Sequence, residues 1–221
     1  MKSIYSISNF NLTNTITRKK RQEMCNLIND YLKEYKILDA LDVGTTNDLD
    51  FNFSNYLIKN LKNISIFKSI SDQKIEDNFF SKISQKSITE DFTFNEIFRM
   101  KSDLVVSNAT IEHVGSFKNQ IKMIKNIISL SKKFFVITTP NRFHPIEFHT
   151  KIPFLHWLPK KIYRKILNIM RLNYFAKEEN LNLLTEKNII TAFKTIGFQN
   201  YKIFKIHLFG LVSNFIIIGK F

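Results

Sequence analysis

The adjacent residues Glu112 and His113 are the first candidates for chemistry in this sequence. A neutral imidazole, with a pKa near ~6.5, can take a proton from a hydroxyl or an amine at neutral pH. We therefore predict that His113 acts as a general base in a transfer reaction. Neighbouring residues on one segment need not face the same way, so a His113 that only packs beneath its loop is the alternative.

A second group of three histidines and one glutamate follows residue 139. Its members are His144, Glu147, His149 and His156. Two zinc ligands on one helical face need a spacing of four residues, which these histidines lack, and prolines interrupt the segment. The lone cysteine, Cys25, cannot form a cysteine-based zinc site. We expect no bound metal, and we rank His144 and His149 behind His113 as candidate bases.

Polar residues also follow three apolar runs of the sequence. These segments are Asp42-Val43-Gly44-Thr45-Thr46-Asn47-Asp48, Ser71-Asp72 and Asn108-Ala109-Thr110. Gly44 has no Cβ, so the chain can turn sharply there and its backbone can approach a ligand closely. Because ligands of open α/β sheets bind outside the carboxyl ends of the strands, the three segments form a candidate binding site.

Apolar runs and amphipathic segments alternate along the chain. We expect strands at residues 37–44, 64–70, 85–89, 102–108, 133–139, 201–208 and 214–221, and helices at residues 17–35, 55–63, 117–131 and 185–196. Strands separated by such helices imply an open, mostly parallel α/β sheet with helices on both faces. The last two strands are joined by only a few residues, so they must pair antiparallel at the C-terminal edge.

This pattern resembles the class I S-adenosylmethionine-dependent methyltransferases, specifically their small type 11 and type 23 groups. The strand that ends in Asp42-Val43-Gly44 is similar to motif I of the family. The strand at 103–108, followed by Ile111-Glu112-His113-Val114, is similar to the motif of its fourth strand. The resemblance covers residues 36–139 and 183–221. It implies one domain over residues 1–221 with a seven-stranded, Rossmann-like sheet and an N-terminal helical segment at 1–35.

The resemblance implies S-adenosyl-L-methionine as the cofactor. Gly44, Thr45 and Thr46 would then approach its methionine moiety, and Asp42 would orient their loop or contact the methionine ammonium. The family has Gly-x-Gly-x-Gly in this loop, whereas Thr46 and Asp48 replace the second and third glycines here. A catalytically inactive methyltransferase fold that serves as a binding protein is therefore one alternative function.

Asp72 is the expected partner of the cofactor's ribose, because a carboxylate matches the two donors of a cis-diol. Ser69 or Ser71 could take its place. Asp72 could instead cap a helix that begins near residue 73.

Residues after the third and fourth strands complete the cofactor site that the resemblance implies. Asp91, with Phe92 beside it, is the candidate for adenine, and an ordinary polar loop is its alternative. Asn108 and Ala109 are the candidates at the end of the fourth strand. Some similar quinone-biosynthesis methyltransferases bind a divalent metal through Glu-x-x-Glu-His, but Ala109 stands at the first glutamate position, which again argues against a metal.

The segment at residues 140–184 is too long for an ordinary connection, and it continues from the carboxyl edge of the sheet. We predict that it forms a lid or an acceptor pocket over the site. Its beginning resembles methyltransferases found among bacterial surface-polysaccharide and lipid genes. Phe154, Leu155, Trp157 and Leu158, with the lysines that follow, predict peripheral contact with an anionic membrane surface.

Charge and composition limit the function further. Across 221 residues, 33 Lys+Arg against 19 Asp+Glu give a net charge of +14, but only six of the basic residues are arginine, which phosphate and guanine recognition favours. Neither a signal peptide nor an apolar run of the ~18 residues that span a bilayer is visible, so we expect a cytoplasmic protein. We expect an enzyme that methylates an oxygen of a small-molecule, saccharide or lipid-linked acceptor. RNA methylation is the alternative, although nucleic acid is not the expected partner.

Overall fold

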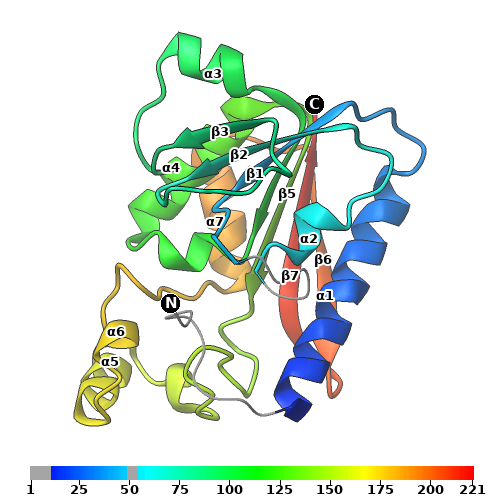
Figure 1. Ribbon diagram of the computed structural model, residues 1–221. Helices are drawn as coiled ribbons and strands as arrows, with labels where there is room; N and C mark the ends of the chain where they lie inside the picture. The colour runs from blue at the N-terminus through cyan, green and yellow to red at the C-terminus, as the bar shows by residue number, and fades with distance from the viewer. Residues whose placement is uncertain (1–10, 49–53) are drawn as a thin grey trace.

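The computed structural model describes residues 11–48 and 54–221, with side chains from Thr15 onward in the first range. A seven-stranded sheet has the order β3-β2-β1-β4-β5-β7-β6 (Figure 1). The strands are β1 (Asp39–Val43), β2 (Ile66–Ser71), β3 (Lys82–Gln85), β4 (Ser102–Asn108), β5 (Ser131–Pro140), β6 (Tyr201–Leu208) and β7 (Leu211–Lys220). The strands β1 to β5 pair in parallel, and β7 pairs antiparallel with β5 and β6. The predicted sheet is confirmed.

Helices cover both faces of this sheet. They are α1 (Asn11–Leu32) and α2 (Tyr56–Lys59) on one face, and α3 (Phe94–Met100), α4 (Phe117–Leu130) and α7 (Glu186–Ile196) on the other. Successive side chains of a strand point to opposite faces. Accordingly, Val106 shares a core with Ile28 of α1, while its neighbour Val105 shares the other core with Met123 of α4.

The segment at residues 140–184, which we call the insertion, forms a lobe beyond the carboxyl edge of the sheet (Figure 1). It contains η2 (Leu155–Trp157), α5 (Lys160–Ile169) and α6 (Asn173–Ala176). The lobe has a small core of its own, in which Leu167 of α5 and Phe175 of α6 are buried. At its base, the amide of Arg142 donates to the carbonyl of Leu184 at 2.9 Å, which fastens both ends of the insertion together.

Four local predictions differ from the structure. The third strand is β3 at Lys82–Gln85 instead of residues 85–89, and the helix expected at 55–63 is only the single turn α2. No described helix begins near residue 73, whereas α3 was not expected. A capping box between Thr93 and Glu96 starts α3 and is its sequence signal. None of the described helices combines the length and apolar character needed to cross a membrane.

Candidate functional site

The chain turns at Gly44, directly after β1, in a way that requires glycine. Its φ is +90°, and a Cβ at this position would lie 2.3 Å from the hydroxyl oxygen of Thr110. That hydroxyl donates to the carbonyl of Val43 at 3.3 Å. The close backbone approach at Gly44 therefore joins the end of β1 to the loop after β4.

Buried hydrogen bonds hold the next residue, Thr45. Its hydroxyl donates to Asp42 Oδ2 at 2.6 Å and accepts from Ser69 at 2.8 Å, and its carbonyl accepts from Ser71 at 2.7 Å. Burial raises the pKa of Asp42 to about 6, although the bond from Thr45 works in the opposite direction. Asp42 thus orients the loop, and any contact between Thr45 and a cofactor falls to its backbone.

The two replaced glycines of this loop are not required by its backbone. Within the part of the chain that the structure describes, Gly44 has a positive φ, but Thr46 and Asp48 do not. The buried side chain of Asn55 accepts from the amide of Thr46 at 3.1 Å and donates to the carbonyls of Thr46 and Asp48 at 2.7 and 3.2 Å. Asn55, which the sequence did not single out, therefore shapes the loop.

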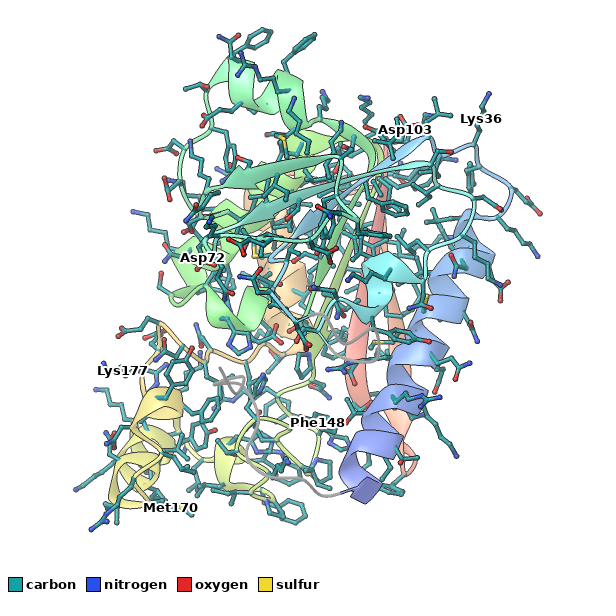
Figure 2. All side chains as sticks on the ribbon, in the orientation of Figure 1. Lys36, Asp72, Asp103, Phe148, Met170 and Lys177 are labelled. Carbon is teal, nitrogen blue, oxygen red and sulfur yellow. The ribbon has the colours of Figure 1, made fainter. Side chains whose placement is uncertain are left out.

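Asp72 lies directly after β2 and is exposed. Figure 2 shows it away from Lys36 and Asp103, which lie at the opposite edge of the sheet. Ser69 and Ser71 are buried and bonded within the Thr45 network. The chain after Asp72 is not helical, so the helix-cap alternative is wrong. Of the three ribose candidates, Asp72 alone offers an exposed oxygen at this edge.

The loop after β3 holds Asp91 and Phe92 in different surroundings. The Asp91 side chain is 93% exposed and pairs with Lys122 of α4 at 2.8 Å. Phe92 packs against the core, with the Lys86 ammonium 4.8 Å from its ring centre. This ion pair agrees with the polar-loop alternative for Asp91.

The end of β4 is fixed against β5 at Asn108 and Ala109. Asn108 Oδ1 accepts from the Thr138 hydroxyl at 2.7 Å, and the amide of Ala109 donates to the Thr138 carbonyl at 3.0 Å. Ala109 is exposed and has a φ of +51°. Both residues therefore lie at the carboxyl edge, beside the Gly44 turn.

Two histidines meet beyond this edge, one from each side of the site. His113 ends η1 (Ile111–His113), and His149 comes from the insertion. Their Nε2 atoms are 3.1 Å apart. His113 Nδ1 lies 2.6 Å from the carbonyl of Asn180, and His149 Nδ1 lies 2.5 Å from Glu147 Oε1. Each Nδ1 thus faces an acceptor, so the two Nε2 atoms can form a hydrogen bond with each other only when one of the two imidazoles is protonated.

Glu112 completes this buried cluster, which we call the Glu–His cluster (Glu112, His113, Glu147 and His149). Glu112 Oε2 accepts from the Thr139 hydroxyl at 3.0 Å, while its Oε1 is buried without a hydrogen-bond partner among the described residues. The ligand atoms of Glu112, His113 and His149 lie within 4.8 Å of one another, which is close enough to hold a cation.

The pKa values of the cluster define its charge. Burial disfavours the charge of Glu147, yet His149 and the amides of His149 and Thr150 lower its pKa to about 2. Burial also opposes the charge of His149, but Glu147 raises the pKa of this histidine above its usual value. Burial and the charge of His149 lower the pKa of His113 to about 4, and burial raises that of Glu112 to about 7.

His144 does not join this cluster in any contact that the structure records. Its Nδ1 is hydrogen-bonded to Ile146, and its ring stacks on Phe148. Its carbonyl accepts from the rings of His156 and Trp157 at 2.7 and 3.3 Å. His144 and His156 therefore shape the beginning of the insertion.

Comparisons with known proteins agree on the fold. No family model and no curated protein matches the sequence. Among solved structures, magnesium protoporphyrin IX methyltransferase of Synechocystis PCC 6803 with bound SAM has a TM-score of 0.54 at 11% identity, over 99% of this chain and 88% of that one. The plantazolicin methyltransferase BpumL with SAH gives 0.56 at 12%, over 92% and 84%. The N-methyltransferase NodS of Bradyrhizobium japonicum WM9 gives 0.52 at 8%, over 92% and 96%.

Proposed function

We propose that this chain, which has the class I S-adenosylmethionine-dependent methyltransferase fold, binds S-adenosyl-L-methionine and transfers a methyl group to an acceptor hydroxyl. One observation carries the proposal. The Gly44 turn and the exposed Asp72 lie along the same sheet edge as the buried Glu–His cluster. One part of the edge suits the cofactor, and the other can take up a proton.

The residues at the β1 and β2 ends fit this cofactor. When bound, it supplies an electrophilic methyl group on a sulfonium. The Asp72 carboxylate would accept from the ribose hydroxyls, and the loop that begins at Gly44 would hold the methionine moiety. The loop already has its shape through Asp42 and Asn55, so binding does not require the two replaced glycines. Asp91, Asn108 and Ala109 remain the proposed neighbours of the adenosyl part.

The two histidines would receive the acceptor's proton. Glu147 holds His149 through Nδ1, so the basic atom of His149 is Nε2. Because the pKa of His149 is raised and that of His113 is lowered, His149 is the stronger base of the pair. A positioned base typically contributes about 10²- to 10⁴-fold to such a reaction. We therefore place His149 before His113, and we assign His144 no proton transfer.

We propose that the Glu–His cluster works with a shared proton and no metal. Once His149 Nε2 has taken the acceptor's proton, the imidazolium balances the Glu147 carboxylate and donates from Nε2 to His113, so the cluster is charge-balanced without a cation. We expect less than about 0.1 equivalent of Zn, Mn, Fe or Mg in protein purified without chelator. Elemental analysis checks this, and a stoichiometric metal that His149→Gln removes would contradict it.

Binding of S-adenosylhomocysteine tests the cofactor proposal. Asp72→Asn removes the charge that would accept two ribose hydrogen bonds, and hydrogen bonds to charged groups are worth ~1.5–3 kcal/mol. We expect affinity measured by calorimetry to fall at least about tenfold. Glu76→Gln is the matched control, because Glu76 is also an exposed acid after β2 and its carboxylate pairs with Lys74. The affinity of Glu76→Gln for S-adenosylhomocysteine should stay within about twofold of the wild-type affinity.

The acceptor that we propose is a small molecule, a saccharide or a lipid-linked compound. The insertion would cover the reacting groups, which favours transfer by orientation and exclusion of water. A lipid-linked acceptor would place the protein in the cytoplasm at the inner face of the membrane.

The alternatives make different predictions in the same assays. A wild-type chain that binds no S-adenosylhomocysteine would favour the inactive binding protein. Tight, salt-sensitive RNA binding together with cofactor binding would favour RNA methylation.

A further inference from the structure

A shallow pocket in the insertion, open to solvent, is lined by positive charge. It lies between the start of the insertion, η2, α5 and residues 181–183. The polar side chains around it are those of Arg142, His156, Lys160, Tyr163, Arg164 and Asn182. Three of these six residues carry a cationic side chain, and none carries a carboxylate.

Two of the cations have only neutral partners. Arg142 donates from Nε to the carbonyl of His156 at 3.3 Å and from Nη2 to that of Leu158 at 3.1 Å. Lys160 donates to the side-chain oxygen of Asn182. Within residues 15–48 and 54–221, neither Arg142 nor Lys160 forms an ion pair with a carboxylate. In the described chain these half-buried charges therefore have no carboxylate at ion-pair distance, and Glu178 acts on Lys160 only from farther away.

The third cation, Arg164, is only partly neutralised. It pairs with Glu178 at 3.2 Å, and the side chain of Glu178 is 43% exposed. Burial, and then repulsion from Arg164, lowers the pKa of Arg142. Burial and repulsion from Arg142 also lower the pKa of Lys160. The three cations thus repel one another across the pocket, and a bound anion would relieve that repulsion.

Tyr163 lines the same wall beside Thr150. The hydroxyls of both residues are buried, and neither has a partner of good hydrogen-bond geometry among the described residues. The Thr150 hydroxyl nevertheless lies within reach of the Tyr163 phenol, so the two hydroxyls face each other. The cations of the wall are therefore the groups that an anion would contact.

Asn182 joins the pocket to the Glu–His cluster. Its backbone amide donates to the carbonyl of Glu112 at 2.7 Å, and its side-chain oxygen accepts from Lys160. Its side-chain nitrogen donates to the carbonyl of Gly115 at 2.6 Å. Only Asn182 would therefore separate a ligand that binds Lys160 from the segment that carries Glu112 and His113.

We propose that the open mouth of this pocket, where Arg142, Lys160 and Arg164 are partly exposed, binds a phosphate group carried by the methyl acceptor. The inference rests on the proposed function, since it names the acceptor's anchoring group. The guanidinium groups of Arg142 and Arg164 and the ammonium of Lys160 offer donors in several directions, which suits the oxygens of a phosphate. The site would fix the acceptor by its phosphate and leave a hydroxyl of the remaining part near His149.

Phosphate binding can be followed through Trp157, the only tryptophan of the chain, whose ring contacts that of His156. Inorganic phosphate is titrated at constant ionic strength without cofactor. We expect saturable binding that weakens at least tenfold in Arg142→Gln and in Lys160→Gln. Lys161→Gln and Lys165→Gln are matched controls, since both lysines are exposed on the same helix, and they should change affinity less than twofold. Absence of binding to wild type, or equal loss in all four variants, overturns the proposal.

Two further arms separate the remaining explanations. Each variant is also titrated with S-adenosylhomocysteine, and unchanged affinity shows that the fold and the cofactor site are intact. Phosphatidylglycerol vesicles then identify the source of the phosphate: if they displace inorganic phosphate, the group belongs to a lipid, and if they do not, it belongs to a soluble acceptor. Single-stranded RNA is the last competitor. If RNA binds equally well to Arg142→Gln and to wild type, and if RNA is the only competitor that displaces inorganic phosphate, the assigned site is contradicted.

Discussion

At the scale of single residues, Asp42 couples the cofactor loop to pH. Burial raises the pKa of its carboxyl to about 6, whereas an unfolded aspartate titrates near ~3.9. The folded protein therefore holds this proton more tightly than the unfolded chain. The stabilisation is present below about pH 4 and is lost as the pH rises to about 6. Above that pH the buried charge accepts from the Thr45 hydroxyl, and no cation among the described residues is recorded at hydrogen-bond distance from it.

We predict that S-adenosylhomocysteine binding releases a proton from Asp42 at mildly acid pH. A methionine ammonium close to Asp42 favours the ionised carboxylate and lowers its pKa. At pH 5.5, about 0.8 proton should leave on binding, and at pH 8 almost none. Calorimetry in buffers of different ionisation enthalpy measures this number.

Asp42→Asn serves as the control for that measurement. The amide oxygen can still accept the Thr45 hydroxyl, so the loop should keep its shape, but no proton can be released. If the variant released as many protons as the wild type, or if the wild type released none at pH 5.5, Asp42 would not be the group that titrates. Its role would then be limited to holding the loop.

At the scale of elements, the sequence predicted buried strands well and edge elements poorly. The strands β1 and β4 are buried along nearly their whole length, so their apolar runs stand out. The side chains of β3 are mostly exposed at the sheet edge, and an exposed strand needs no apolar pattern. Helix α3 was not predicted for a related reason. Its outer face carries the exposed Phe94 and Phe98, whereas an amphipathic pattern requires polar residues there.

The candidate site was predictable only where its signal is local. Gly44 and Asp72 follow recognisable strand ends, so their positions could be inferred from the chain itself. The contact between His113 and His149 joins residues 36 positions apart, and it depends on how the insertion folds back over the sheet. The side chain of Asn55 likewise bonds to the backbone of Thr46, nine residues earlier in the chain. Bonds to backbone groups leave no sequence motif, so this role could not be predicted.

The pairing of β5 with β7 depends on one small residue. Gly219 lies opposite Phe135, and a Cβ at Gly219 would come within 2.1 Å of that ring. Phe135 is fully buried, so its ring cannot move aside without displacing Phe193, on which it stacks at 5.8 Å. We expect Gly219→Ala to lower the free energy of unfolding by about 1–3 kcal/mol, measured by urea denaturation.

A double-mutant cycle distinguishes this clash from a loss of backbone freedom. In a Phe135→Leu background the smaller side chain leaves room for the new methyl group. Gly219→Ala should then cost at least about 1 kcal/mol less than in the wild type. Equal costs in both backgrounds would assign the effect to the strand backbone instead.

At the scale of the whole molecule, exposed apolar side chains gather on the insertion, where lysines lie beside them. Seven of the 17 exposed large apolar side chains in the described chain belong to residues 140–184. Among them, Ile162 and Ile169 lie seven residues apart on α5, Leu158 directly precedes this helix, and the exposed Lys161 and Lys165 lie beside Ile162. Aromatic and aliphatic groups flanked by lysines suit the interface of an anionic bilayer. The insertion carries eight Lys+Arg against three Asp+Glu, which is +5 of the net charge of +14.

We predict that the protein floats with phosphatidylglycerol vesicles and much less with neutral phosphatidylcholine vesicles. Trp157→Ser and Ile162→Ser each remove a half-exposed apolar side chain, so each should weaken binding about tenfold. Phe94→Ser is the matched control: Phe94 is 81% exposed on α3, at the end of the molecule opposite the insertion (Figure 1). Equal weakening by Phe94→Ser would mean that exposed apolar groups act without regard to position. Salt should weaken binding to the anionic vesicles, because the lysines contribute through screened charge, while the apolar contribution persists.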